Sequence, residues 1–400
     1  MVLAVAAGAF GTASAVAGGP SAQPRLISGP AARAYAPWSA FLASPRKLPV
    51  SARNGVTTIA VSVRRAGRNR NRLRAVFAFS GRWQLRSRGR TLATIKVSRA
   101  RPLTSDLPTA DAFRLCGGSA APYPQYALSA DGSLWVGCRG RGTLLRVDSV
   151  TGETRAILRV SGSSPYAIAA GLGAVWSAER GPAISRIDLR TGRASQAFTG
   201  TGFSYIWTAA GSVWAHDDDA RRLIRYDPSS RRVVAQLPTG DGASALVEQG
   251  GLIWIVNHRD GTLERIDPSA NSITPLSKLP GDAPERMGFA AGSLWVTGRG
   301  TDLLRVDPAT GAVQATIELG AGGIDLRAAG GSIWVAAPTT EDDLRGNPFL
   351  DRVLRIDPAT NAIVETIRAK GRVTVNGTAV TGTAFWIADT EHGRLYRLTR

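Results

Sequence analysis

The stretch "GSLWVTGRGTDLLRVDPATGAVQATIELG" occupies residues 292–320, and variants of it recur along the chain. Every copy carries a tryptophan at the same place: Trp135, Trp176, Trp214, Trp254, Trp295, Trp334 and Trp386. A period of about forty residues with four short strands per unit is typical of propeller blades. The sequence therefore predicts an all-β fold, a seven-bladed β-propeller.

The recurrent "DPATG" of this unit, residues 307–311, has the composition of a tight turn. The aspartate can accept backbone N–H bonds, the proline presets φ, and the glycine adopts positive φ. Because an aspartate stands in this slot in six copies, we interpret it as structural rather than catalytic. The repeated tryptophans are interpreted in the same way, as packing between blades.

The last copy ends without an outer strand, and the missing strand has to come from elsewhere in the chain. "LATIKV", residues 92–97, matches the outer-strand segment "QATIEL" at residues 314–319. The sequence predicts that this strand closes the last blade, which would remove the open sheet edge. The ring would then occupy residues 89–400.

The "G-S-L-W-V … R-V-D-P-A-T-G" unit resembles the repeats of the virginiamycin B lyase (streptogramin lyase) family, and it is similar to exported YVTN-type seven-bladed propellers. The lyase resemblance implies Mg²⁺ held by glutamates and a histidine base in a Glu-x-His arrangement. This chain has no Glu-x-His; its histidines are His216, His258 and His392. No catalytic residue is therefore assigned.

Net charge divides the chain sharply. The first acidic residue is Asp106, so residues 1–105 hold 18 of the 49 Lys and Arg residues and no counter-charge. Residues 1–17 read as a secretory signal, with a buried apolar strand or an anchor as the alternative. Residues 18–88 read as a basic lead segment, partly disordered or forming a small β module. We expect a secreted or envelope-associated protein.

The basic residues between positions 64 and 101 suggest an anionic partner. In an exported protein the nearer candidates are cell-wall polymers or lipid headgroups rather than nucleic acid. A solvated tail with an arginine-rich composition is the alternative. Nothing in the sequence indicates a partner subunit, and a monomer is expected.

Two rings of side chains are predicted at the mouth of the central channel. The residues three positions after the tryptophans include candidate oxygen ligands for Ca²⁺ or Mg²⁺: Glu179, Asp217, Asn257 and Asp389. The alternative is that they stabilise loop turns. The starts of the inner strands supply candidate ligand-binding residues, with a solvated rim as the alternative: Gln125, Tyr166, Tyr205, Glu285, Arg286, Asp325 and Asn376.

Two further features vary between copies. The sixth unit contains an insertion at residues 338–352, which is expected to lengthen a mouth loop. Cys116 and Cys138 are the only cysteines and could form one disulfide in an oxidising compartment. Two functions remain open: a non-catalytic propeller that binds a ligand or partner at its mouth, or a metal-dependent lyase or hydrolase working there.

Overall fold

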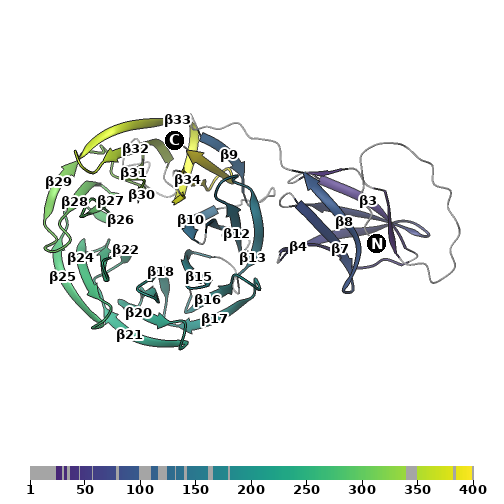
Figure 1. Ribbon diagram of the computed structural model, residues 1–400, viewed down its shortest axis with the longest axis horizontal. Helices are drawn as coiled ribbons and strands as arrows, with labels where there is room; N and C mark the ends of the chain where they lie inside the picture. Colours follow the sequence, from purple (N-terminus) through teal and green to yellow (C-terminus); the bar gives the residue numbers. More distant parts are fainter. Residues whose placement is uncertain are drawn as a thin grey trace. The chain divides into compact units, whose positions relative to one another are not determined.

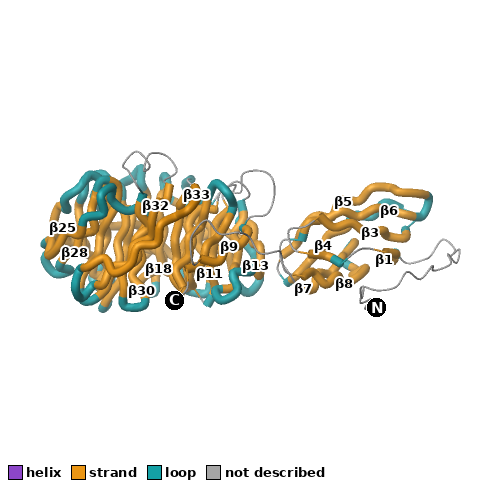
Figure 2. The backbone as a smooth tube through the Cα atoms, turned by 90° about the horizontal axis from the view of Figure 1, so that it is seen from above, coloured by secondary structure: helices purple, strands orange, loops and turns teal. Residues whose placement is uncertain are grey.

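The computed structural model describes residues 24–28, 31–33, 37–44, 46–55, 57–77, 81–98, 110–115, 124–130, 132–138, 142–160, 165–178, 181–338, 349–381 and 384–398. All regular structure in this part is β-strand, as predicted (Figure 2). No helix in it is long and apolar enough to cross a membrane. The chain divides into two compact units, one comprising Met1–Pro102 with Glu153–Leu158, the other comprising the rest.

The first unit is a sheet of eight strands in the order β1-β3-β6-β5-β4-β7-β8-β2. Its strands are β1 (Arg25–Ser28), β2 (Ala32–Arg33), β3 (Pro37–Ala43), β4 (Val50–Asn54), β5 (Thr57–Gly67), β6 (Arg70–Val76), β7 (Gly81–Ser87) and β8 (Arg90–Ser98). β5 joins the two halves of this sheet, because its beginning pairs with β4 and its end pairs with β6. The core contains Trp38, Phe77 and Trp83. The centre of the Phe77 ring lies 5.4 Å from that of Trp38 and 5.5 Å from that of Trp83.

The prediction that residues 92–97 close the last sheet is wrong. Residues 92–97 lie in β8, which pairs with β7 and buries Ala93, Ile95 and Val97 in the core of the first unit. The strand that closes the last sheet is β9 (Ala110–Arg114), which pairs with β35 (Arg394–Leu398). Alternating apolar residues are common to every half-buried strand, so the match carried no information about the partner. The ring therefore begins after Pro102, not at residue 89.

Five four-stranded antiparallel sheets follow, arranged around a ring in Figure 1. Residues 154–158, which are grouped with the first unit, lie in the fourth strand of the first of these sheets. The first two contain β10 (Pro124–Ala130), β11 (Ser133–Cys138), β12 (Thr143–Asp148), β13 (Thr154–Arg159), β14 (Ala167–Gly171), β15 (Ala174–Ala178), β16 (Ala183–Asp188) and β17 (Ala194–Thr199). The next two contain β18 (Phe203–Ala209), β19 (Ser212–Asp217), β20 (Arg222–Asp227), β21 (Arg232–Pro238), β22 (Ala243–Gln249), β23 (Leu252–Asn257), β24 (Thr262–Asp267) and β25 (Ser272–Lys278). The fifth contains β26 (Ala283–Ala290), β27 (Ser293–Arg299), β28 (Thr301–Val306) and β29 (Val313–Ile317).

A seven-stranded sheet completes the ring, in the order β30-β31-β32-β33-β34-β35-β9. Its remaining strands are β30 (Asp325–Ala329), β31 (Ser332–Ala337), β32 (Phe349–Asp357), β33 (Ala362–Thr381) and β34 (Ala384–Asp389). The 20-residue β33 connects its two parts: residues 362–368 pair with β32, and residues 375–381 pair with β34. Two groups of four strands thus share one continuous strand.

The repeated tryptophans are buried in the second strand of each group, as predicted. Each lies opposite an arginine of the third strand, as in the pairs Trp214↔Arg225 and Trp295↔Arg305. Both arginines place their guanidinium groups over the tryptophan ring, at 5.3 and 5.6 Å from its centre. Cation–π contact thus accompanies the strand pairing. The sequence shows the arginine of "LLRVD" but not this role.

The turns after the third strands join neighbouring sheets. Asp307 accepts the backbone N–H groups of Ala309 and Thr310 at 2.8 and 3.0 Å, which confirms the structural role proposed for this aspartate. Arg305 donates to the Pro358 carbonyl and to the Asn361 side chain in the turn of the next sheet, both at 3.1 Å. The turns therefore carry hydrogen bonds across the interfaces between sheets.

Candidate functional site

The innermost strands of the ring surround a cavity of about 550 Å³. Figure 1 shows β10, β18, β22, β26 and β30 nearest the centre of the ring. The polar and aromatic residues that line the cavity are Ser129, Tyr205, Trp207, Thr208, Ser244, Glu248, Glu285, Arg286, Arg299, Asp325, Arg327 and Asn376. This size and mixture of groups are typical of small-molecule sites.

One wall of the cavity is a network of alternating charges. Arg286 lies between two carboxylates, with Nη1 3.7 Å from Glu285 Oε2 and Nε 3.6 Å from Asp325 Oδ1. Arg299 approaches Glu285 at 3.6 Å, and Arg327 contacts Asp325 at 2.9 Å. The three arginines and two carboxylates of this network leave one positive charge in excess, and their positions are constrained by one another.

Asp325 is the most strongly fixed member of this network. Its carboxylate is 6 % exposed and accepts the backbone N–H and hydroxyl of Thr378 in β33, both at 2.9 Å. Arg327 returns a bond from Nε to the Thr378 carbonyl at 3.0 Å. Two neighbouring inner strands, β30 and β33, are thus tied together beside the cavity, so the charged groups of this wall are preorganised.

Two stacked aromatic side chains form another part of the lining. Tyr205 and Trp207 stand two residues apart on β18, so they share one face of the strand. Their ring centres are 5.9 Å apart with planes inclined by 12°. Burial raises the pKa of the Tyr205 phenol, and the nearby Arg286 partly offsets this effect. The phenol is therefore neutral at physiological pH and able to donate a hydrogen bond.

The structure brings together most of the predicted ligand-binding residues. Tyr205, Glu285, Arg286, Asp325 and Asn376 all line the cavity. Tyr166 precedes β14 and packs against the core instead, and the Gln125 side chain lies outside the described residues. Sequence reasoning missed Trp207, Arg299 and Arg327. Alternation along the inner strand, from Tyr205 to Trp207 and from Asp325 to Arg327, was the signal available for two of them.

The predicted metal ligands that the structure describes are enclosed within separate sheets. Asp217, Asn257 and Asp389 are all completely buried. Among the described residues no group of three or more His, Cys, Asp or Glu side chains could hold a metal ion. Glu179 lies outside the described residues. The three described candidates are therefore buried in different sheets, and a metal site that includes Glu179 stays a prediction.

Each of these three side chains has an identifiable structural task. Asp217 accepts the Gly202 N–H at 2.8 Å and pairs with Arg222 at 3.0 Å. Burial opposes ionisation of Asp217, but the hydrogen bonds from Thr201, Gly202 and Arg222 outweigh it and lower the pKa. Asn257 donates to Glu264 at 2.8 Å, and Asp389 accepts from the Thr374 N–H at 3.3 Å. The contact of Asp217 with Gly202 fits the alternative considered above, stabilisation of a loop, whereas those of Asn257 and Asp389 join neighbouring strands.

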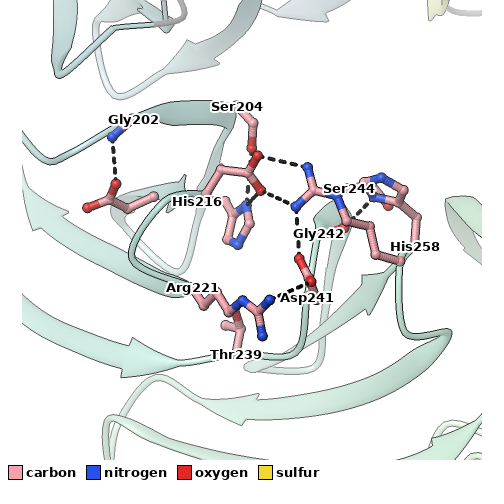
Figure 3. Close-up of polar contacts among 12 residues, drawn as sticks. Gly202, Ser204, His216, Arg221, Thr239, Asp241, Gly242, Ser244 and His258 are labelled. Atoms are coloured by element: carbon pink, nitrogen blue, oxygen red, sulfur yellow. Dashed lines mark hydrogen bonds and ion pairs between the residues drawn. The ribbon is translucent and has the colours of Figure 1, made fainter.

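Beside Asp217 lies the histidine network of Figure 3. His216 is completely buried, and its Nδ1 lies 3.1 Å from Ser204 Oγ and 3.7 Å from Asp218. Burial lowers the pKa of His216 to about 4, so the ring is neutral near pH 7. Arg259 contacts Asp218 through two bonds of 2.9 Å and Asp241 through one of 2.8 Å. This network connects the third and fourth sheets through charged loop residues.

The other two histidines are also engaged. His258 Nδ1 lies 2.5 Å from the Gly242 carbonyl oxygen, also drawn in Figure 3. His392 Nδ1 lies 2.9 Å from Asp389, whose pKa is raised because burial outweighs the attraction of this histidine. None of the three histidines lines the cavity.

The cysteines and the sixth-unit insertion are described only in part. Cys138 is completely buried at the end of β11 and is disulfide-bonded. Cys116 lies outside the described residues, so its pairing stays a prediction. Residues 339–348 of the insertion also lie outside them, whereas Asp351 bonds to Arg352 and Arg368 at 3.0 and 3.1 Å.

Comparison with known proteins supports the fold alone. No family model matches the chain, and no curated protein matches its sequence. Among solved structures it is similar to U3-55K, a WD40 β-propeller protein, with a TM-score of 0.59 and 10 % sequence identity. The similarity covers 72 % of this chain and 98 % of the U3-55K chain. The all-β ring is thus propeller-like.

Proposed function

We propose that this chain is an exported, non-catalytic propeller that binds a small polar ligand, of the sugar type, in its central channel. The observation that carries the proposal is the cavity of about 550 Å³, where stacked Tyr205 and Trp207 lie beside a fixed network of arginines and carboxylates. Aromatic faces pack against the C–H surfaces of a sugar ring, and charged groups bond to its hydroxyls.

Within this proposal the ring has seven blades. Five four-stranded sheets account for five blades, and the pairing of β33 supports counting two more. Its first part completes a group with β30, β31 and β32, whereas its last part begins a group with β34, β35 and β9. The seven repeated tryptophans support the same count, with one in each group.

Binding is favoured over lyase or hydrolase chemistry by the state of the cavity carboxylates. Three of the described carboxylates line the cavity. Glu285 and Asp325 are already paired with arginines, at distances of 2.9–3.7 Å, and Glu248 accepts the Ala210 N–H at 2.7 Å. A general acid or base has to exchange protons with a bound substrate, and these ion pairs oppose that exchange. The resemblance to virginiamycin B lyase therefore extends to the repeat but, in this proposal, not to the activity.

Export is supported by the disulfide of Cys138, because such bonds persist mainly in oxidising compartments. The signal-like residues 1–17 lie outside the described part of the chain. Export and the small-ligand role are separate parts of the proposal and are tested separately. A fusion of residues 1–30 to a reporter that is active only after secretion tests the first part.

Calorimetric titration of the full chain with a panel of neutral and acidic monosaccharides tests the ligand. We expect at least one sugar to bind. Trp207→Leu should weaken it by about tenfold or more because it removes an aromatic face, and Tyr205→Phe should weaken it because it removes the phenol donor while keeping the stacked ring. Arg259→Met, in the loop network outside the cavity, is the matched control and should leave binding unchanged. Failure of the whole panel, or equal losses in all three variants, would contradict the proposal.

A further inference from the structure

We propose that one face of the first unit, formed by β3, β6 and β5, is a binding surface for a linear phosphate polyanion. Its central strand, β6, exposes Arg70, Arg72 and Arg74. Alternate residues of a strand lie on the same face, about 6.6–6.8 Å apart. The three guanidinium groups therefore form a line of positive charge along β6, which we call the β6 arginine line.

The strands on either side extend this charge without neutralising it. Arg64 of β5 lies directly opposite Arg72 and is also exposed. Like charges placed opposite each other on neighbouring strands are destabilising. Residues 1–102 contain no Asp or Glu, so this stretch of chain has no carboxylate side chain with which to compensate the repulsion. An external anion would relieve this cost on binding, which is the charge complementarity that the surface offers.

The β6 arginine line is partly preorganised by an aromatic ring. Phe41 of β3 lies opposite Arg72 in the register. The Arg70 guanidinium lies 3.5 Å from the centre of the Phe41 ring, and that of Arg72 lies 5.3 Å from it. Such cation–π contacts hold long side chains in place while their N–H groups remain available to phosphate oxygens.

A recess lies at the Arg74 end of the line. It has a volume of about 650 Å³, and its polar lining consists of Arg74 with the hydroxyls of Ser39 and Ser62. Both serines are register partners of Arg74, one on each side, and both are exposed. A guanidinium flanked by two hydroxyl donors suits one phosphate group, so the recess can seat one unit of a polymer that continues along β6.

The side chains on this face disfavour two other classes of anionic partner, single-stranded nucleic acid and a lipid surface. Proteins that bind single-stranded nucleic acid stack bases on open aromatic rings, but Phe41 is covered by Arg70. Stable attachment to a lipid surface combines basic charge with apolar side chains that enter the bilayer. Phe41 is the large apolar side chain beside the β6 arginine line, and it is half-buried with the Arg70 guanidinium lying over its ring. A flexible phosphate polymer without bases fits better.

The test uses the full chain, medium-chain inorganic polyphosphate as the probe, and calorimetric titration between about 50 and 200 mM salt. The variant Arg70→Gln/Arg72→Gln/Arg74→Gln should weaken binding by about tenfold or more. It should also lower the slope of log K against log salt by about two, since each lost phosphate contact contributes about 0.7. The control Arg82→Gln/Arg90→Gln/Lys96→Gln removes the same charge from exposed positions on β7 and β8. It should change affinity by less than about threefold.

Further variants examine the recess and the alternatives. Ser39→Ala/Ser62→Ala should weaken polyphosphate binding several-fold with an unchanged salt slope, because no charge is lost. Equal losses in the two charge-removing variants would overturn the proposal, since net charge alone would then explain binding. It would also be overturned if, at equal phosphate concentration, a single-stranded oligonucleotide or vesicles containing phosphatidylglycerol bound more tightly than polyphosphate.

Discussion

At the scale of single residues, His216 shows how a titratable side chain was placed at a buried position that the other copies of the repeat fill with small, uncharged residues. The residue two positions after the tryptophan is Val256 in the fourth sheet and Ala336 in the seven-stranded sheet. Like His216, both are buried. His216 Nε2 has no hydrogen-bond partner among the described atoms, while Nδ1 faces Ser204. Because this environment disfavours the charged ring, the histidine makes stability sensitive to acid.

We predict that His216 makes the ring lose stability as the pH falls from 6.5 towards 4. Its folded pKa of about 4 lies below the usual 6.5, so the neutral ring is favoured in the fold and protonation favours the unfolded chain. A shift of this size corresponds to about 3 kcal/mol. Urea unfolding at several pH values should show this loss in the native chain but not in His216→Val.

The neighbouring ionisable groups, Asp217, Asp218, His258 and Arg259, are present in both proteins, so the difference between their pH profiles isolates His216. The carboxyl pKa of Asp218 is lowered, chiefly by the Arg259 hydrogen bonds, which places its own effect at lower pH. Superimposable pH profiles for the native chain and His216→Val would show that the histidine is solvated in the fold.

The candidate site was predictable at this scale only in part. Tyr205, Glu285, Arg286, Asp325 and Asn376 stand at the starts of inner strands, and the repeat places all such starts around one channel. The burial of Asp217, Asn257 and Asp389 could not be predicted, because a short polar side chain at a strand end can either face solvent or bond to its own fold. The partner that decides, such as Arg222 for Asp217, depends on the fold around it.

At the scale of elements, the closing strand is where sequence reasoning failed. Residues 92–97 and β9 are both short segments that precede the first four-stranded sheet in the chain, and apolar alternation describes the first better than the second. β9, with the sequence "ADAFR", is nevertheless the partner of β35, and Leu115 after it donates its N–H to the Gly393 carbonyl at 2.7 Å. Pairing is decided by the contacts on both sides of a strand, which a single segment does not reveal.

We predict that Leu115→Ala destabilises the end of the ring, whereas Ile95→Ala does not. Leu115 is 1 % exposed, and truncating a buried leucine costs about 2–5 kcal/mol. Ile95 is similarly buried, at 6 %, but in the core of the first unit. Hydrogen exchange of peptides covering β35 should accelerate in Leu115→Ala and stay unchanged in Ile95→Ala. The opposite pattern would restore residues 92–97 as the closing strand.

At the scale of the whole molecule, the repeat made the all-β ring predictable because its most regular residues are those that build the interfaces. Buried tryptophans and turn aspartates recur since every sheet meets its neighbours in the same way. The first unit has no such periodicity, and only short strand-like stretches pointed to a β module there. Its eight-stranded sheet depends on β5 pairing with β4 at one end and β6 at the other, which no local pattern encodes.

The same reasoning predicts how the ring responds when one interface loses its hydrogen bonds. Arg305 bonds to Pro358 and Asn361 of the next sheet, whereas Arg265, at the same place in the preceding repeat, has no such bond among the described residues. There the interface bond is made by Trp254, whose Nε1 donates to the Pro308 carbonyl at 2.8 Å. Arg305→Met and Arg265→Met thus remove the same side chain from equivalent strand pairs, with and without interface bonds.

We expect Arg305→Met to lower the free energy of unfolding by about 1–3 kcal/mol, because the Asn361 and Pro358 acceptors lose a charged donor. Arg265→Met should cost well under half as much. Asn361→Gly removes one acceptor from the other side of the same bond; Asn361 has a φ of 60°, which glycine adopts without strain. It should therefore weaken the ring in the same direction as Arg305→Met. Equal falls in the denaturant midpoints of the two arginine variants would show that the bonds from Arg305 to the next sheet do not stabilise the ring.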